Sequence, residues 1–146
     1  MVNLKALKKK SLRDYLPVGT TDSEYAFCWL LGEIKHAFPK RPSVAKLKRF
    51  IKSHCDELQK LGIFNMLLSD SQFLFAYCST KLCWITRRAP FDTAQLIDTE
   101  MRVDFGEETT PNDVVSVVAT APLTDNEQWQ TLQSGELLCL KNGETH

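Results

Sequence analysis

The sequence predicts an α+β fold in which two helices are followed by mostly antiparallel strands. A helix-start signal at residues 21–24 precedes apolar residues at helical spacing. A second stripe of the same period covers residues 44–58, and strand-like runs replace it from residue 63 onward. This order predicts a layered arrangement, with the helices on one face of the sheet.

The first predicted helix begins with the sequence TDSE at residues 21–24, which matches the capping box. In this motif the Thr21 hydroxyl accepts from the Glu24 amide, and the Glu24 carboxylate reaches back to the helix start. Pro39 ends the run. The second predicted helix begins at Ser43 and is expected to be capped by Gly62. Because only a few residues join them, the two helices should pack as antiparallel neighbours.

Strands are expected at residues 63–69, 72–78, 82–86, 101–105, 114–120 and 137–140. The pair Asp70-Ser71 should form a tight hairpin turn between the first two strands, and Asn142-Gly143 a turn after the last. A second T-D-x-E sequence at residues 124–127 predicts a capping box before a short helical turn that contains Trp129.

Composition indicates a soluble globular domain: 146 residues, of which 43% are hydrophobic and 25% charged. Lys+Arg and Asp+Glu balance at 18 each, which argues against a nucleic-acid partner. No stretch approaches the roughly 20 apolar residues of a membrane span, and no apolar signal-peptide core follows the N-terminal lysines. We therefore expect no membrane association and a cytoplasmic protein.

Several residue types that often carry chemistry are predicted to be structural. The five cysteines favour buried free thiols, and neither they nor the three histidines show metal-ligand spacing, so no metal site is expected. A solvated pair is favoured over an anion clamp for Arg87-Arg88, and a solvated N-terminus over an anion-binding patch for the basic residues up to Arg13. The three tryptophans, Trp29, Trp84 and Trp129, are expected to pack in or beside the core.

Seven segments together resemble the bacterial class II glutamine amidotransferase-like proteins, a subgroup of the N-terminal nucleophile (Ntn) hydrolases. They are GTTDSEYAFCWLL at 19–31, FNMLLSD at 64–70, WITRRAPF at 84–91, VDF at 103–105, TTPND at 109–113, PLTDNE at 122–127 and GE at 135–136. Their order and spacing make the resemblance specific. It covers residues 17–146 as the C-terminal part of a glutamine amidotransferase type 2 domain, whereas the basic segment 1–16 matches poorly.

The resemblance implies that the chain is part of a four-layer α/β/β/α Ntn-hydrolase sandwich. In such enzymes the mature chain begins with a cysteine, whose thiol attacks the side-chain amide of glutamine while its own α-amino group acts as the base. Ammonia leaves, a thioester forms, and water hydrolyses it. An Asn-Gly pair in the N-terminal half holds the oxyanion. No cofactor is implied.

The residues that carry this catalysis are not found at the positions that the resemblance requires. The chain begins Met1-Val2, and its Asn-Gly pair, Asn142-Gly143, lies at the wrong end. The upstream arginine that would grip the glutamine carboxylate is also missing. We therefore expect a fragment with no catalytic residue of its own, inactive alone, and whether it serves in an enzyme stays open.

One binding residue is implied by the resemblance. Asp22 matches the family aspartate that receives the α-amino group of glutamine. A carboxylate in the first turn of a capped helix is held rigidly and can face a cationic group. The sequence alone favours an acidic residue that stabilises the positive end of the helix dipole, by about 0.3–1 kcal/mol, and the resemblance reverses this preference in favour of the ligand contact.

Three functions remain open at this point. In the first, the chain is a glutamine amidotransferase fragment that needs a complementing N-terminal chain and acts on glutamine or a γ-glutamyl compound. Alternatively, it is an inactive remnant, or a non-catalytic binding or scaffold domain that keeps the Asp22 site. Because half of a sandwich exposes sheet edges, we expect the chain alone to be poorly soluble, oligomeric or partly disordered.

Overall fold

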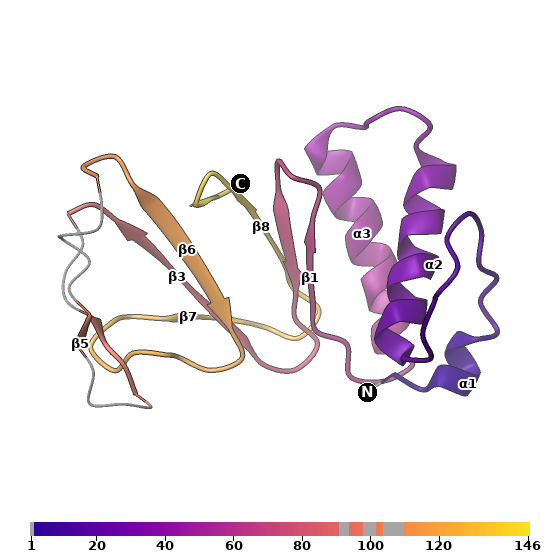
Figure 1. Ribbon diagram of the computed structural model, residues 1–146, viewed down its shortest axis with the longest axis horizontal. Helices are drawn as coiled ribbons and strands as arrows, with labels where there is room; N and C mark the ends of the chain where they lie inside the picture. The colour runs from indigo at the N-terminus through magenta and orange to yellow at the C-terminus, as the bar shows by residue number, and fades with distance from the viewer. Residues whose placement is uncertain (1, 91–93, 98–101, 104–109) are drawn as a thin grey trace. The chain divides into compact units, whose positions relative to one another are not determined.

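The computed structural model describes residues 2–90, 94–97, 102–103 and 110–146. The chain forms two compact units, residues 1–64 and 65–146. The first is helical and the second consists of antiparallel strands (Figure 1). The predicted α+β class is therefore confirmed, whereas the predicted division between residues 16 and 17 stays a prediction.

The helical unit contains α1 (Leu4–Leu7), α2 (Asp22–Ala37) and α3 (Val44–Gln59). Ring contacts show that α2 and α3 are antiparallel neighbours, as predicted. The Trp29 ring lies 5.3 Å from that of His54, and the Phe38 ring, just after α2, lies 5.0 Å from that of Phe50. The later residue on the α2 side therefore contacts the earlier residue of α3, as antiparallel packing requires.

The predicted capping box starts α2, with one difference. The Thr21 hydroxyl accepts from the Glu24 amide at 3.2 Å. The Glu24 carboxylate does not return to Thr21 but accepts from the amides of Val18 and Gly19, both at 2.8 Å. It thereby fixes the loop that leads into the helix, because those two amides gain a charged acceptor.

The N-terminal segment packs against the helices through its apolar residues, whereas the basic side chains of Lys5, Lys8, Lys9 and Arg13 are exposed, as predicted. Val2 is 7% exposed and Leu7 is fully buried. The Lys10 ammonium pairs with Glu57 at 2.6 Å and lies 4.0 Å from the centre of the Trp29 ring. Local patterning could not indicate this, because each partner lies far along the chain.

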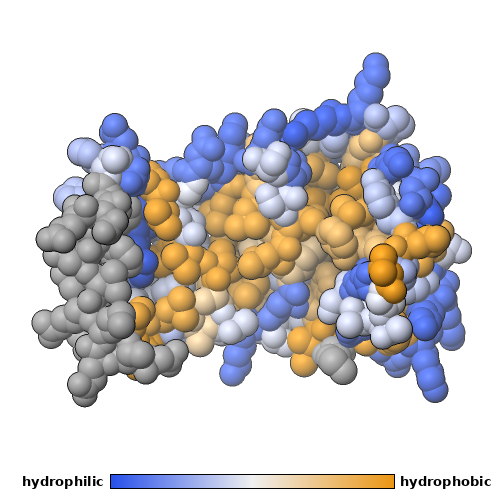
Figure 2. All heavy atoms as spheres, in the orientation of Figure 1, coloured by the Kyte–Doolittle hydropathy of each residue, from blue (hydrophilic) through white to orange (hydrophobic). Residues whose placement is uncertain are grey.

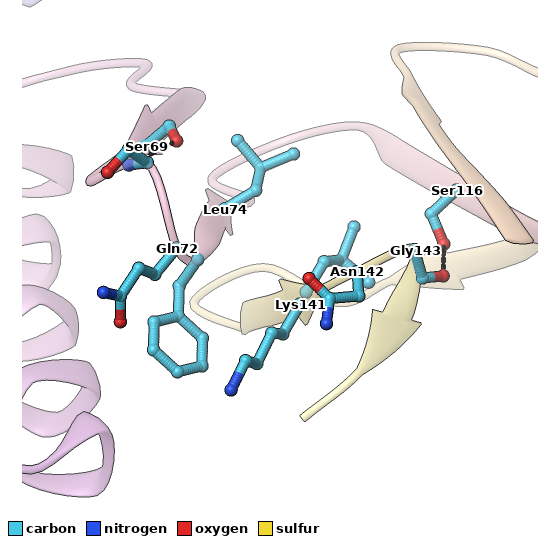
Figure 3. A pocket seen from close by; sticks show the side chains of 10 residues that line it. Ser69, Gln72, Leu74, Ser116, Lys141, Asn142 and Gly143 are labelled. Atoms are coloured by element: carbon cyan, nitrogen blue, oxygen red, sulfur yellow. Dashed lines mark hydrogen bonds between the residues drawn. The ribbon is translucent and has the colours of Figure 1, made fainter.

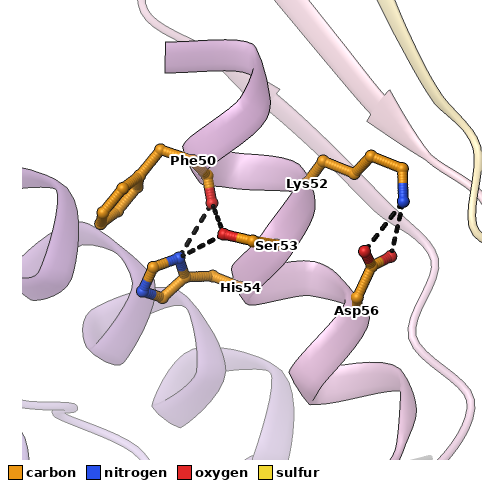
Figure 4. A network of polar contacts seen from close by, with 5 residues as sticks. All are labelled: Phe50, Lys52, Ser53, His54 and Asp56. Atoms are coloured by element: carbon orange, nitrogen blue, oxygen red, sulfur yellow. Dashed lines mark hydrogen bonds and ion pairs between the residues drawn. The ribbon is translucent and has the colours of Figure 1, made fainter. Parts of the chain in front are cut away.

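The α3 helix buries the predicted apolar stripe of Leu47, Ile51, Cys55 and Leu58. A polar network follows another part of its surface (Figure 4): Lys52 pairs with Asp56 one turn later at 2.8 Å. The Ser53 hydroxyl and His54 Nδ1 both lie within hydrogen-bond distance of the Phe50 carbonyl oxygen. The C-terminal cap is Lys60, and the predicted cap Gly62 follows two residues later with a φ of 145°.

The described residues of the second unit form three sheets. The strands are β1 (Met66–Ser69), β2 (Leu74–Tyr77), β3 (Leu82–Arg88), β4 (Ala94–Gln95), β5 (Arg102–Val103), β6 (Val114–Ala119), β7 (Gln130–Leu132), β8 (Leu137–Lys141) and β9 (Glu144–Thr145). They form a four-stranded sheet of order β1-β2-β8-β9, a three-stranded sheet of order β6-β3-β7 and the pair β4-β5. Every pairing among the described strands is antiparallel.

The expected hairpins are present, but the first turn is longer than predicted and a further strand follows the second. Pairing of β1 with β2 ends at Ser69 opposite Leu74, so four residues separate the strands instead of the predicted two. The Asp70 carboxylate accepts from the amides of Gln72 and Phe73 and organises this turn. The Asn142-Gly143 turn is confirmed, and β9 continues beyond it as a strand that the sequence pattern did not indicate.

The second predicted capping box is wrong, because residues 125–129 form no helix. The Thr124 hydroxyl instead donates to Glu127, and the Trp129 indole donates to the Thr124 hydroxyl at 2.9 Å. The strand β7 then begins at residue 130 and was not predicted. Of the strand expected at 101–105, β5 covers two residues, and the others lie outside the described residues.

Apolar side chains form the core of the strand unit but also reach its surface. Cys78, Leu82 and Leu132 cluster with the partly buried Trp84 beside them. Leu67 and Val115 remain 55% and 44% exposed, and Figure 2 shows apolar residues on the face in view. The expected poor solubility of the isolated chain stays a prediction. Among the described helices, none has the length and hydrophobicity that a membrane span requires.

Candidate functional site

Asp22, the predicted substrate-binding residue, is the first residue of α2 and is half-buried. One carboxylate oxygen, Oδ1, accepts from the Ser23 amide at 3.0 Å. The other, Oδ2, accepts from the Val2 amide at 2.7 Å. Two separate backbone donors therefore fix the orientation of this carboxylate.

The N-terminal segment is itself anchored where it meets Asp22. Val2 forms an isolated antiparallel bridge with Gly62, and the Asn3 amide donates to the Leu61 carbonyl at 2.8 Å. Both partners follow α3. The residues after α3 thus hold the N-terminal segment in place, and this segment in turn holds the Asp22 carboxylate at the start of α2.

This arrangement can bind a cation. An ionised carboxylate offers about four acceptor positions, and the two amides occupy two of them. A primary ammonium group carries three donors and suits the remaining positions. Since the carboxylate is already oriented, little conformational entropy is lost when such a group binds.

The described cysteines lie in surroundings that suppress nucleophilic chemistry. All five are buried, as predicted. Burial raises the pKa of the Cys55 thiol to about 12, and burial followed by the nearby Glu24 carboxylate raises the pKa of Cys28. The reactive form of cysteine is the thiolate, so both side chains are protonated and unreactive at neutral pH.

Arg87 and Arg88 each bind a glutamate, and the prediction of solvated side chains holds for Arg88 but is wrong for Arg87. Arg87 binds Glu127 through two nitrogens, with its Nε at 2.6 Å, and both side chains are less than one-fifth exposed. Arg88 binds Glu144 through two nitrogens as well, in a more exposed position. Each charge is matched by a glutamate far along the chain.

The packing prediction is confirmed for Trp29 and Trp84, whereas Trp129 is half-buried and its indole donates to the Thr124 hydroxyl. Trp29 is 6% exposed, and Trp84 packs against the Cys78 cluster. Within the described residues, no three His, Cys, Asp or Glu side chains gather in a way that could hold a metal ion.

Sequence reasoning missed Val2 as part of the Asp22 site. The two residues are 20 positions apart, and the contact uses a backbone amide that every residue except proline has. No side-chain pattern could therefore have indicated it.

Comparisons with known proteins agree on one family. The family model described as glutamine amidotransferases class-II matches residues 2–146, including the N-terminal segment. YafJ of Escherichia coli (strain K12), whose name assigns it provisionally to the glutamine amidotransferases, is 51% identical over 140 residues, which are 94% of this chain and 55% of that protein. A Haemophilus influenzae protein (strain Rd) with a similar provisional name is 37% identical over 97% of this chain and 48% of its own length.

A solved structure gives the same result. The 2.0 Å crystal structure of a predicted glutamine amidotransferase from Pseudomonas aeruginosa PA01 superposes with a TM-score of 0.78 at 51% sequence identity. The match covers 92% of this chain and 56% of the other. The chain thus spans about half the length of the relatives that it matches.

Proposed function

Because the chain belongs to the class II glutamine amidotransferase family, we propose that it is part of an enzyme that hydrolyses the side-chain amide of glutamine and releases ammonia. In this proposal Asp22 binds the α-amino group of the substrate. A complementing segment, in the same or another chain, supplies the N-terminal cysteine and the oxyanion site. We place the activity in the cytoplasm.

The geometry of Asp22 supports this role best. Its half-buried carboxylate is held by the Ser23 and Val2 amides and keeps capacity for an ammonium group. A carboxylate that only stabilised the helix dipole needs no second amide from a distant segment. The distance of 2.7 Å to the Val2 amide is typical of a charge-assisted bond.

Replacing Asp22 with asparagine is expected to raise KM for glutamine by about 10- to 150-fold. This is the effect of losing a hydrogen bond to a charged group, about 1.5–3 kcal/mol. The measurement is ammonia release by this chain mixed with the part of E. coli YafJ that it does not cover. The unmixed chain should give only background.

Asp14→Asn is the matched control, because Asp14 makes an exposed pair with Lys35 at 3.5 Å and lies in the same helical unit. This variant should leave KM unchanged. An unaltered KM in the Asp22→Asn mixture disproves the binding assignment. Absence of ammonia release from every mixture overturns the proposed activity itself.

A γ-glutamyl compound is the alternative substrate. It carries the same α-amino group as glutamine, so Asp22 serves both equally. Assays of glutamine and γ-glutamyl amides side by side separate the two, since the substrate that the enzyme prefers shows the larger kcat/KM.

A further inference from the structure

A pocket of about 260 Å³ lies at one end of the four-stranded sheet, between the β1–β2 turn and the β8–β9 turn (Figure 3). Leu74 of β2 is opposite Leu140 of β8, so residues 70–73 and 141–143 emerge at the same end of the sheet. Drug-sized ligands occupy roughly 300–1,000 Å³. This pocket therefore suits a smaller molecule, of about amino-acid size.

The polar part of the lining is rich in hydrogen-bond donors. Gln72 comes from one turn, Asn142 comes from the other, and Lys141 is the last residue of β8 (Figure 3). The hydroxyls of Ser69 and Ser71 add to them. These groups can together surround an oxyanion.

The charge of the lining is positive. Among the described residues that line the pocket, Lys141 is charged and none is Asp or Glu. Two carboxylates lie close to the lining: Asp70, within the β1–β2 turn, accepts from the amides of Gln72 and Phe73, and Glu144 is bound to Arg88. One ammonium group balances one negative charge, so a carboxylate fits this lining better than a phosphate dianion, which would keep an unbalanced charge.

An apolar wall completes the pocket. The Lys141 ammonium lies 5.3 Å from the centre of the Phe73 ring, within the range of a cation–π interaction, which holds it beside the ring. Leu74 and Leu140 also line this wall. A ligand with a short hydrocarbon body can therefore bury apolar surface here while its carboxylate faces Lys141.

Both turns are fixed by contacts within the protein. The Ser71 amide donates to the Ser69 hydroxyl at 3.2 Å, and the Ser116 hydroxyl of β6 donates to the Gly143 carbonyl at 2.7 Å. Ser71 and Asn142 have φ values of 71° and 51°, which side-chain-bearing residues adopt uncommonly. These contacts hold the pocket open in advance of binding.

We propose that this pocket binds a small monocarboxylate with a short hydrocarbon body. The site is built from the strand unit alone, whereas Asp22 belongs to the helical unit. The proposal therefore stands whether or not the chain takes part in glutamine hydrolysis.

Titration of the ¹⁵N-labelled full chain with sodium butyrate tests the proposal. We expect chemical-shift changes at the amides of Ser71, Gln72, Asn142 and Gly143, with a dissociation constant on the order of 1 mM for so small a ligand. Acetate should bind more weakly because it leaves the Phe73 wall bare. Phosphate should also bind more weakly, and sodium chloride at equal ionic strength should cause no saturable change.

Lys141→Met keeps the length of the side chain, removes its charge and should weaken butyrate binding at least tenfold. Lys81→Met is the matched control, because Lys81 is an exposed lysine of the same unit outside the pocket. Equal weakening in both variants, tighter binding of phosphate than of butyrate, or no localised shift in the wild-type chain each overturns the proposal. The wild-type titrations decide the matter even if Lys141→Met does not fold.

Discussion

Replacing Glu127 with glutamine is expected to destabilise the strand unit by about 2–4 kcal/mol. The change removes a charged partner of Arg87, whose side chain is only 16% exposed. Removing one member of a buried ion pair costs about 3–5 kcal/mol, and both the partial exposure here and the further contacts of Arg87 reduce that cost. The loss should appear in urea unfolding followed by the fluorescence of Trp84 and Trp129 in a Trp29→Phe background.

Glu144→Gln provides the matched control for this effect. Its partner Arg88 is the next residue along β3, and the pair again involves two arginine nitrogens, but the two side chains are 60% and 43% exposed. Exposed pairs contribute about 0–1 kcal/mol. If the two variants lose equal stability, burial does not decide the strength of these pairs.

The ion pair between Glu127 and Arg87 should also make the stability of the strand unit depend on pH. The hydrogen bond from Arg87 lowers the pKa of the Glu127 carboxyl below its usual range. Its stabilisation is therefore complete above the usual glutamate pKa of about 4.3 and is lost as the pH falls through the lowered value. The stability difference between wild type and Glu127→Gln should accordingly be constant near neutral pH and shrink in acid. A difference that grows in acid contradicts this assignment.

Local sequence signals predicted the elements that depend on local interactions. The TDSE capping box and the apolar stripe of α3 use contacts within one or two helical turns, so both helices begin and run as expected. The second T-D-x-E sequence failed because its glutamate has a stronger partner. Glu127 binds Arg87, 40 residues away, and the Thr124 hydroxyl donates to the Glu127 carboxylate instead of accepting from its amide.

The candidate site shows the same limit. Asp22 was found from the sequence because its motif and its place at the helix start are local features. Its contact with the Val2 amide depends on how the N-terminal segment meets the residues after α3, as do the buried positions of Val2 and Leu7. Such contacts are set by tertiary packing, which single-sequence patterns do not record.

Replacing Gly143 with alanine is expected to destabilise the strand unit by about 3 kcal/mol. Gly143 has a φ of 76°, at which an L-residue with a Cβ costs roughly 1–2 kcal/mol. A Cβ at this position would also lie 2.7 Å from the carbonyl carbon of Val114, and nearer still to its oxygen. Since backbone cannot yield as a side chain does, the overpacking adds about 1–3 kcal/mol.

Gly135→Ala separates these two contributions. Gly135 has a similar φ of 84°, but a Cβ there would meet nothing within 4 Å. Its cost should therefore be the conformational part alone, about 1–2 kcal/mol, and Gly143→Ala should exceed it by the cost of pushing β6 and β9 apart. Equal losses in the two variants would mean that the Val114 backbone moves aside freely. The Ser116 hydroxyl of β6 donates a hydrogen bond to the Gly143 carbonyl at 2.7 Å. Because moving the Val114 backbone aside would also break this hydrogen bond, we expect β6 and β9 to resist the movement.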